Sequence, residues 1–237
     1  MGNNEFTPAA SAQTTAALGQ QVYNHILRQI IEVQLEPGER VNVTQITEQL
    51  GISRTPIRTA LEQLAEDGLI KRLGDRGYQV TPLSMTDCFN LCDARKIIEG
   101  TAAAMAATNI SSADLEILER SIVDARECLA RQGYDDFAKQ DTIFHEALLR
   151  AAGNRYLLQV YDTIKVRITR YRYIISTYCR DSAAQDTSHA VAKHTCIYRA
   201  LKNRYSSVAR NEMEEHIAYT YRTLFNLGNF INKQGQK

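Results

Sequence analysis

The chain has 237 residues, enough for one or two domains of ordinary size. An apolar fraction of 44% supports packed cores and excludes a wholly disordered chain. The formal net charge of +1 excludes a bulk basic field, so any binding to nucleic acid must rest on locally placed cations. The longest strictly apolar run covers only residues 102–107, whereas a membrane-spanning helix needs about 20, and we therefore expect no membrane partner.

The N-terminus and the cysteines bear on the compartment. Residues 1–15 lack the basic start and apolar stretch of a secretory signal, and their small polar composition predicts a flexible tail. The five cysteines are an odd number and contain no CxxC pair, which disfavours a disulfide scaffold and favours a reducing environment. These features predict a cytoplasmic protein.

Helical periodicity begins at residue 16. Glu36-Pro37-Gly38 ends the first predicted helix, which covers residues 16–35. A second, short helix is predicted over residues 43–50, because Asn42 is a good N-cap and Gly51 a stop. The apolar face of the first helix recurs every four residues, at Leu18, Val22, Ile26 and Ile30.

A third helix and a hairpin complete the N-terminal part. The helix is predicted from Ser53, its N-cap, to Gly68, where glycine favours a helix end. Two short runs around the glycine-rich turn at residues 74–77 then predict a β-hairpin over residues 69–80. Pro82 marks a boundary, so residues 16–82 form the first predicted domain.

After Pro82 the chain contains no further proline, and helical periodicity continues. The sequence therefore predicts a mainly α protein, in which an N-terminal winged helix-turn-helix is followed by an all-helical bundle over residues 83–237. The predicted helices of the bundle cover residues 84–107, 111–132, 134–152, 155–179, 188–202 and 204–227.

The order helix, turn, helix, hairpin is that of a winged helix-turn-helix, whose second helix enters the major groove of DNA. The first turn of that helix offers Ser53, Arg54, Thr55 and Arg58, and the two arginines share one face. Arginine can bind guanine through two hydrogen bonds or hold a phosphate. Solvated charges on an amphipathic helix are the alternative that spacing alone leaves open.

A second constellation lies in the bundle. Asp141 and His145 are four residues apart and project from one helix face, while His194 and His216 lie on the last two predicted helices. Three imidazoles and one carboxylate suit a divalent ion such as Zn²⁺, Ni²⁺ or Mn²⁺. Spacing alone equally allows histidines that only form hydrogen bonds in the core.

Two further groups are weaker candidates. Cys88 and Cys92 are helical neighbours that would suit a redox or metal pair, although free cysteine is usually a small core residue. The basic and aromatic run at residues 167–173 offers an effector pocket or nucleic-acid contacts, although a division between core, dimer face and solvent is the simpler interpretation.

The N-terminal motifs carry a resemblance. The stretch SRTPIR at residues 53–58, with ALEQL at 60–64 and EDGLI at 66–70, resembles the DNA-reading core of GntR-type transcription regulators, and residues 74–80 resemble their wing. The resemblance implies that Arg54, Thr55 and Arg58 contact operator bases and phosphates. It also implies that Gly77 lets the wing approach the minor groove. Independently of the resemblance, the place of Arg72 and Arg76 on the predicted hairpin would let them reach the flanking backbone or the minor groove.

One position departs from that family. Members often carry an arginine on the preceding helix where this chain has Thr44. The departure puts one DNA contact in doubt, and Arg40 is the nearby cation that would have to replace it.

Residues 83–237 are similar to the all-helical effector domain, called FCD, of the FadR-like subgroup. The similarity rests on residues 93–99, 141–145, 152–154, 193–194 and 213–216. It implies that Asp141, His145, His194 and His216 hold a divalent ion, and that Arg95 faces a pocket where its guanidinium pairs with a carboxylate.

These features predict a ligand-responsive transcription regulator rather than an enzyme. A homodimer would bind a pseudo-palindromic operator in double-stranded DNA, and a small carboxylate effector at the metal and Arg95 would modulate the binding. The resemblance implies a repressor. A metal-dependent enzyme and a direct metal sensor remain as alternatives; the enzyme is disfavoured because Glu146 and Glu215 flank candidate ligands without an evident catalytic role.

Overall fold

The computed structural model describes residues 15–178 and 180–219. Within this range the chain divides into two compact units between Leu83 and Ser84. The predicted flexible tail lies almost wholly outside the described residues, and so do the predicted helical residues beyond 219.

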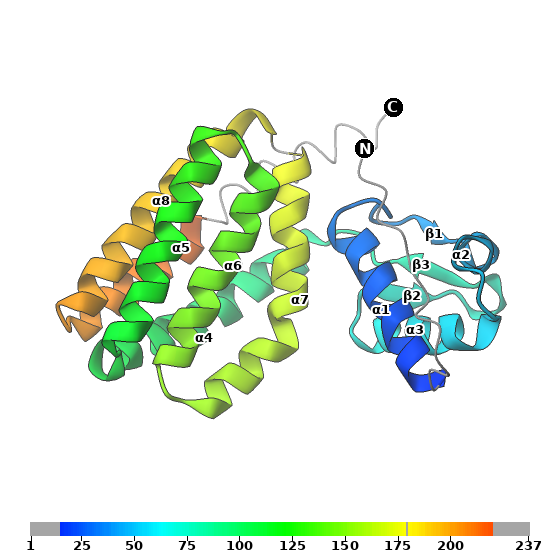
Figure 1. The fold of residues 1–237 in the computed structure, drawn as a ribbon, viewed down its shortest axis with the longest axis horizontal. Helices are drawn as coiled ribbons and strands as arrows, with labels where there is room; N and C mark the ends of the chain where they lie inside the picture. The colour runs from blue at the N-terminus through cyan, green and yellow to red at the C-terminus, as the bar shows by residue number, and fades with distance from the viewer. Residues whose placement is uncertain (1–14, 179, 220–237) are drawn as a thin grey trace. The chain divides into compact units, whose positions relative to one another are not determined.

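The N-terminal unit combines three helices with a small antiparallel sheet (Figure 1). Its strands lie in the order β1-β3-β2. The predicted hairpin is confirmed, because Ile70 pairs with Val80 and Arg72 with Tyr78. The elements are α1 (Thr15–Ile31), β1 (Arg40–Val41), α2 (Val43–Leu50), α3 (Arg54–Glu66), β2 (Ile70–Arg72), a 3₁₀ turn (Gly74–Arg76) and β3 (Tyr78–Val80).

Apolar side chains of α1 and α3 form the core of this unit. Val22 and Ile26 of α1, and Ile57 and Leu61 of α3, are fully buried. The four-residue spacing of these side chains explains why both segments are helical, since only the helix places all of them on one face. Tyr23 of α1 is also buried, and its hydroxyl donates a 2.6 Å hydrogen bond to the Asp67 carboxylate at the end of α3.

The ends of these helices follow the predicted signals in part. Asn42 caps α2 by accepting a hydrogen bond from the Gln45 amide, and Gly51 ends this helix with a left-handed φ of 62°. Ser53 occupies the N-cap position of α3 as predicted, although its side chain makes no capping hydrogen bond. The first helix ends at Ile31, earlier than the predicted residue 35.

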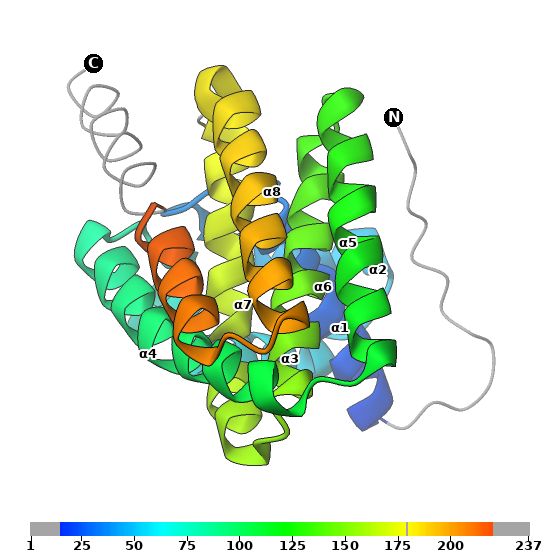
Figure 2. The ribbon, with the colours of Figure 1, turned by 90° about the vertical axis from the view of Figure 1, so that its left-hand side faces the viewer.

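The C-terminal unit is all-helical over its described residues (Figure 2). Helix α4 packs against α6, α7 and α8, while α5 packs against α6 and α8. Helix α8 begins at Arg180, well before the predicted residue 188. The helices are α4 (Met85–Asn109), α5 (Ser112–Ala130), α6 (Tyr134–Ala151), α7 (Arg155–Tyr178), α8 (Arg180–Lys202) and a last helix over residues 206–219.

The bundle has a large apolar core that fixes the positions of its helices. Leu118 of α5, Phe144 and Leu148 of α6, and Tyr161 of α7 are fully buried. Phe144 precedes His145 in the chain and its ring stacks on His194, with centroids 3.9 Å apart. Core packing thereby brings polar residues of α6 and α8 together. Among the described residues, every helix is too short or too polar to cross a membrane.

Candidate functional site

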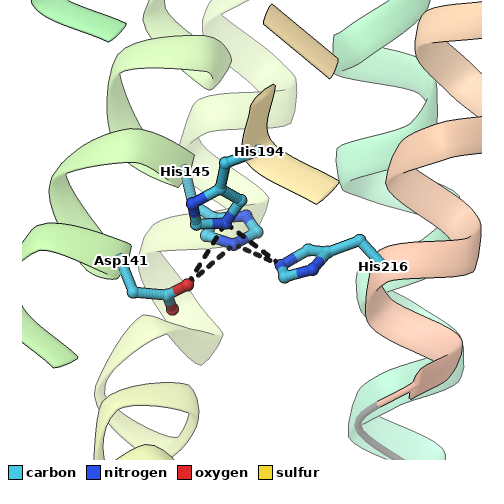
Figure 3. Close-up of side chains that lie close together, drawn as sticks. All are labelled: Asp141, His145, His194 and His216. Atoms are coloured by element: carbon cyan, nitrogen blue, oxygen red, sulfur yellow. Dashed lines mark hydrogen bonds and ion pairs between the residues drawn. The ribbon is translucent and has the colours of Figure 1, made fainter. Parts of the chain in front are cut away.

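Four polar side chains converge inside the helical unit (Figure 3). Asp141 and His145 come from α6, one turn apart, His194 comes from α8, and His216 comes from the last helix. Four of their ligand-type atoms lie within 4.8 Å of one another. All four residues are buried, and His145 is fully inaccessible. The structure thus brings together the four residues that the sequence predicted as one cluster.

The donor atoms of the cluster face a common point. His216 Nε2 lies 3.1 Å from His145 Nε2 and 3.3 Å from His194 Nε2. Asp141 Oδ1 lies 3.3 Å from His194 Nε2 and 3.7 Å from His145 Nε2. One carboxylate oxygen and three imidazole nitrogens therefore lie close enough together to share one ion.

Glu99 supports the cluster from α4. One of its oxygens, Oε2, accepts a hydrogen bond from His145 Nδ1, and the other lies 2.6 Å from Arg95 Nε. Glu99 and Arg95 are both buried. In the sequence, Glu99 is recognisable only as part of a family motif, since a carboxylate distant from His145 in the chain gives no sign of pairing with it.

Arg172 of α7 supports the cluster from the other side. Its Nε lies 2.5 Å from Asp141 Oδ2, and its Nη1 donates a 3.0 Å hydrogen bond to the Thr142 hydroxyl. Its remaining nitrogen, Nη2, is buried and has no hydrogen-bond partner among the described residues. Arg172 lies in the basic and aromatic run at 167–173, and the sequence pattern does not distinguish it from its neighbours there.

The charges around the cluster favour metal-ligating protonation states. Burial lowers the pKa of His194, and burial together with the neighbouring imidazoles lowers the pKa of His216 well below its usual value. Burial opposes ionisation of Asp141, but Arg172 and then His145 hold its pKa well below the usual range. Burial likewise opposes ionisation of Glu99, but Arg95 and His145 lower its pKa to about 2. Neutral imidazoles beside an ionised carboxylate are the forms that bind metals.

These residues fit a divalent ion. One carboxylate oxygen and three imidazole Nε2 atoms lie within 4.8 Å of one another, and a cation placed among them would bind all four donors. The buried Nδ1 atom of His216 has no hydrogen-bond partner among the described residues, so no contact fixes the tautomer of this ring, whose Nε2 faces the cluster. The His₃Asp set suits Zn²⁺, Ni²⁺ or Mn²⁺.

A cavity of about 120 Å³ adjoins the cluster. Its polar wall includes Asp141 and His216 of the cluster, together with both supporting arginines, Arg95 and Arg172. Its other walls include aromatic side chains such as Tyr134 and Tyr219. Arg95 thus lines a cavity as predicted, although its Nε is also engaged by Glu99.

The residues predicted to read DNA lie on exposed positions of the N-terminal unit. Ser53, Arg54, Thr55 and Arg58 are exposed at the start of α3. Arg58 Nε lies 3.0 Å from Glu62 Oε1 in an exposed ion pair. The second part of the predicted set lies on the hairpin, where Arg72 and Arg76 are exposed and Gly77 has a φ of 89°, a conformation that favours glycine.

Two further groups named from the sequence are Thr44 with Arg40 and the cysteine pair Cys88 and Cys92. Thr44 and Arg40 are both exposed, on α2 and β1 respectively. Cys88 and Cys92 are buried, and burial raises the pKa of both thiols, Cys88 to about 11. Protonated buried thiols are poor nucleophiles and poor ligands, which favours the interpretation of this pair as core residues.

Two regions match known families. Residues 18–80 match the family described as "Bacterial regulatory proteins, gntR family", and residues 90–219 match the FCD domain. The chain belongs to the gntR family and carries an FCD domain. The expected resemblance, the mainly α fold and the winged helix-turn-helix of this regulator are confirmed.

The regulator has relatives in Escherichia coli K12. It is 27% identical to the HTH-type transcriptional repressor RspR over 212 residues, covering 90% of this chain and 91% of RspR. It is 25% identical to the repressor GlaR over 156 residues, covering 64% of this chain and 71% of GlaR. The solved structure of E. coli McbR/YncC shares the fold, with a TM-score of 0.76 at 20% identity, over 89% of this chain and 98% of that one.

The family settles the broad class of function. The family is described as bacterial regulatory proteins, and RspR and GlaR are named HTH-type transcriptional repressors, so the chain is a transcription regulator and the metal-dependent enzyme is set aside.

Proposed function

We propose that this regulator is an operator-binding repressor whose affinity for DNA is set by a small carboxylate bound beside a divalent metal ion. The observation that carries the proposal is the shared wall of one cavity, where His216 and Asp141 of the His₃Asp cluster lie together with Arg95 and Arg172. A cavity lined by candidate metal ligands and by two guanidinium groups suits an anion that is small enough for about 120 Å³.

The residues of the cluster and of the cavity wall would have separate roles in binding the ion and the carboxylate. Oδ1 of Asp141 and the Nε2 atoms of His145, His194 and His216 would hold the ion. The ion, when bound, supplies Lewis-acid affinity for a carboxylate oxygen. Arg95 and Arg172 balance the negative charge of the ligand, and the aromatic walls exclude water from it.

DNA binding is assigned to the exposed residues of α3 and of the hairpin. Arg54, Thr55 and Arg58 would contact bases and phosphates in the major groove, with Ser53 at the helix start. Arg72, Arg76 and Gly77 would place the wing beside the neighbouring phosphates or minor groove. Two copies in a homodimer would present two such helices to successive major grooves of a pseudo-palindromic operator.

Repression is the proposed sign of regulation. RspR and GlaR are both named repressors, and the effector would then relieve repression by favouring a state with lower affinity for DNA. An effector shifts the equilibrium between the state with high affinity for DNA and the state with low affinity only as far as its own affinities for these two states differ. The ligand must therefore bind the DNA-free state more tightly.

Thermal unfolding of metal-loaded and metal-stripped protein tests the ligand site. A panel of small carboxylates is added to both forms. A ligand present at about 100 times its dissociation constant adds roughly 2.7 kcal/mol to the stability of the state that binds it. We expect one class of acid to stabilise the loaded protein alone. Stabilisation by metal with no response to any acid would contradict the effector site and favour a direct metal sensor.

A further inference from the structure

Glu99 is buried to a relative exposure of 0%, the lowest of any carboxylate among the described residues of the helical unit, and both of its oxygens have partners. Oε2 accepts the hydrogen bond from His145 Nδ1, and Oε1 lies 2.6 Å from Arg95 Nε. Glu99 lies outside the candidate ligand set, because His145 stands between it and the other cluster atoms. Its position therefore calls for a role other than metal ligation.

The contact with Glu99 decides which ring nitrogen of His145 carries the proton. A neutral imidazole has one N–H, and a carboxylate that accepts from Nδ1 places the proton there. Nε2 is then left with its lone pair, and this is the atom that faces Asp141 and His216. His216 differs, because its buried Nδ1 has no hydrogen-bond partner among the described residues.

Arg95 holds Glu99 in this arrangement and also lines the cavity. Both side chains of the ion pair are buried, with 6% of Arg95 and 1% of Glu99 exposed. One guanidinium thus lies within reach of any cavity ligand and of the carboxylate that orients His145. A chain of direct contacts runs from the cavity through Arg95 and Glu99 to His145.

We propose that Glu99 is a positioning residue, which fixes His145 with its Nε2 lone pair toward the metal and is itself anchored by Arg95. The inference rests on the proposed metal centre. It extends that proposal by assigning how a ligand of the cavity is coupled to the metal: an anion that pairs with Arg95 acts on the carboxylate that holds His145. Because coupling between two ligands is reciprocal, metal and anion change each other's affinity by the same factor.

The first test replaces Glu99→Gln in the full chain. In the amide one of the two carboxylate oxygens becomes an NH₂ group, which donates, so the side chain cannot accept from Arg95 Nε and His145 Nδ1 through two oxygens as Glu99 does. Loss of such an outer carboxylate typically costs about 10–100-fold in metal affinity, and we expect a loss of this size for Zn²⁺ in competition with a chromogenic chelator. Glu146→Gln is the matched control. It removes the carboxylate next to His145 in the chain, which pairs with Arg150 instead, and should leave Zn²⁺ affinity unchanged.

A second readout separates positioning from general damage to the fold. Nitrogen-15 NMR of the imidazole in metal-free protein reports which nitrogen of His145 is protonated. We expect the Nδ1–H form in the wild type and loss of that preference in Glu99→Gln. The same tautomer in both proteins would overturn the inference, and so would equal Zn²⁺ affinity.

A double-mutant cycle tests the anchoring by Arg95. We expect the single substitution Arg95→Met to weaken Zn²⁺ binding. Adding it to Glu99→Gln should cause no further loss of Zn²⁺ affinity, because both substitutions act through one contact. The double variant removes both charges of a buried pair and leaves no unpaired guanidinium, so it also serves if Glu99→Gln fails to fold. Additive losses would overturn the role of Arg95.

The outcomes distinguish this inference from the proposed function. If the wild type binds none of the three ions Zn²⁺, Ni²⁺ and Mn²⁺, the metal centre and the inference are both overturned. Tight binding by the wild type with equal binding by Glu99→Gln would overturn the inference alone.

Discussion

Arg172 and Asp141 form an ion pair between α7 and α6, with 2.5 Å between Nε and Oδ2. The pair leaves Oδ1 of Asp141 to face His194 and His145. It also places a guanidinium in the wall of the cavity. One side chain thus orients a candidate metal ligand and lines the space proposed for the effector.

Replacing Arg172→Lys should weaken metal binding. Lysine is a point charge that cannot reproduce the planar hold of the guanidinium on the carboxylate. Loss of an oriented ligand should lower Zn²⁺ affinity by about 10-fold, measured by competition with a chromogenic chelator. Arg150→Lys is the control, because Arg150 forms an exposed pair with Glu146 on the same helix as Asp141. Equal affinities of Arg172→Lys and the wild type would contradict the orienting role.

Replacing His194→Ala should reduce metal occupancy. The change removes one of four donors that lie within 4.8 Å of one another. Elemental analysis of the purified protein measures the occupancy, and operator binding without effector should change far less. His189→Ala is the matched control on the same helix, since His189 stacks on Tyr219 outside the cluster. Full occupancy in His194→Ala would exclude His194 from the ligand set.

Replacing Arg58→Ala should weaken binding to the operator by about 1–3 kcal/mol. Arg58 is exposed on α3, and its ion pair with Glu62 is exposed as well, so little free energy is needed to release it for DNA. A gel-shift titration at fixed salt, with an operator obtained by selection from random DNA, measures the change. Arg150→Ala in the helical unit should leave binding unaltered. Undiminished affinity of Arg58→Ala would place the groove contact elsewhere.

The Tyr23–Asp67 hydrogen bond should make the stability of the chain depend on alkaline pH. Burial, and then the contact with Asp67, raise the pKa of Tyr23 above its usual value. Below about pH 10 the hydroxyl is protonated in both folded and unfolded chains, and the full contribution is present. At higher pH the unfolded chain alone loses the proton, so the free energy of unfolding falls as pH rises.

The Tyr23→Phe variant checks this linkage. It should be less stable by about 1 kcal/mol near neutral pH, because a part-buried hydrogen bond is lost. Above about pH 10 its stability should fall less steeply than that of the wild type. Urea unfolding across this range measures both effects. Tyr205→Phe changes a tyrosine that is 59% exposed and should behave like the wild type. Parallel curves for Tyr23→Phe and the wild type would refute the linkage.

The sequence predicted elements whose signals are local. The caps at Asn42 and Gly51 and the four-residue period of α1 depend only on near neighbours, and they located α1 and α2 closely. The strand β1 was missed because it has only two residues, and its pairing with β3 bridges residues 40 and 79. The start of α8 was missed because residues 180–187 carry few apolar side chains to set a period.

The cluster was predicted by spacing and resemblance together, but its supports were not. Asp141 and His145 are one turn apart on a helix, which a sequence displays directly. Glu99 and Arg172 reach the cluster only through the packing of α4 and α7 against α6. In the sequence, nothing distinguishes these two charged residues from the many charged residues that lie on the surface. Burial, which gives them their effect, is a property of the folded bundle.

The most direct test of the account measures operator affinity at fixed salt, with metal-loaded and metal-stripped protein, before and after addition of the carboxylate that stabilises the loaded form. The account predicts that the acid weakens operator binding by the loaded protein and has no effect on the stripped protein. Release of DNA by the acid from stripped protein, or operator affinity that follows free metal without any acid, would contradict it.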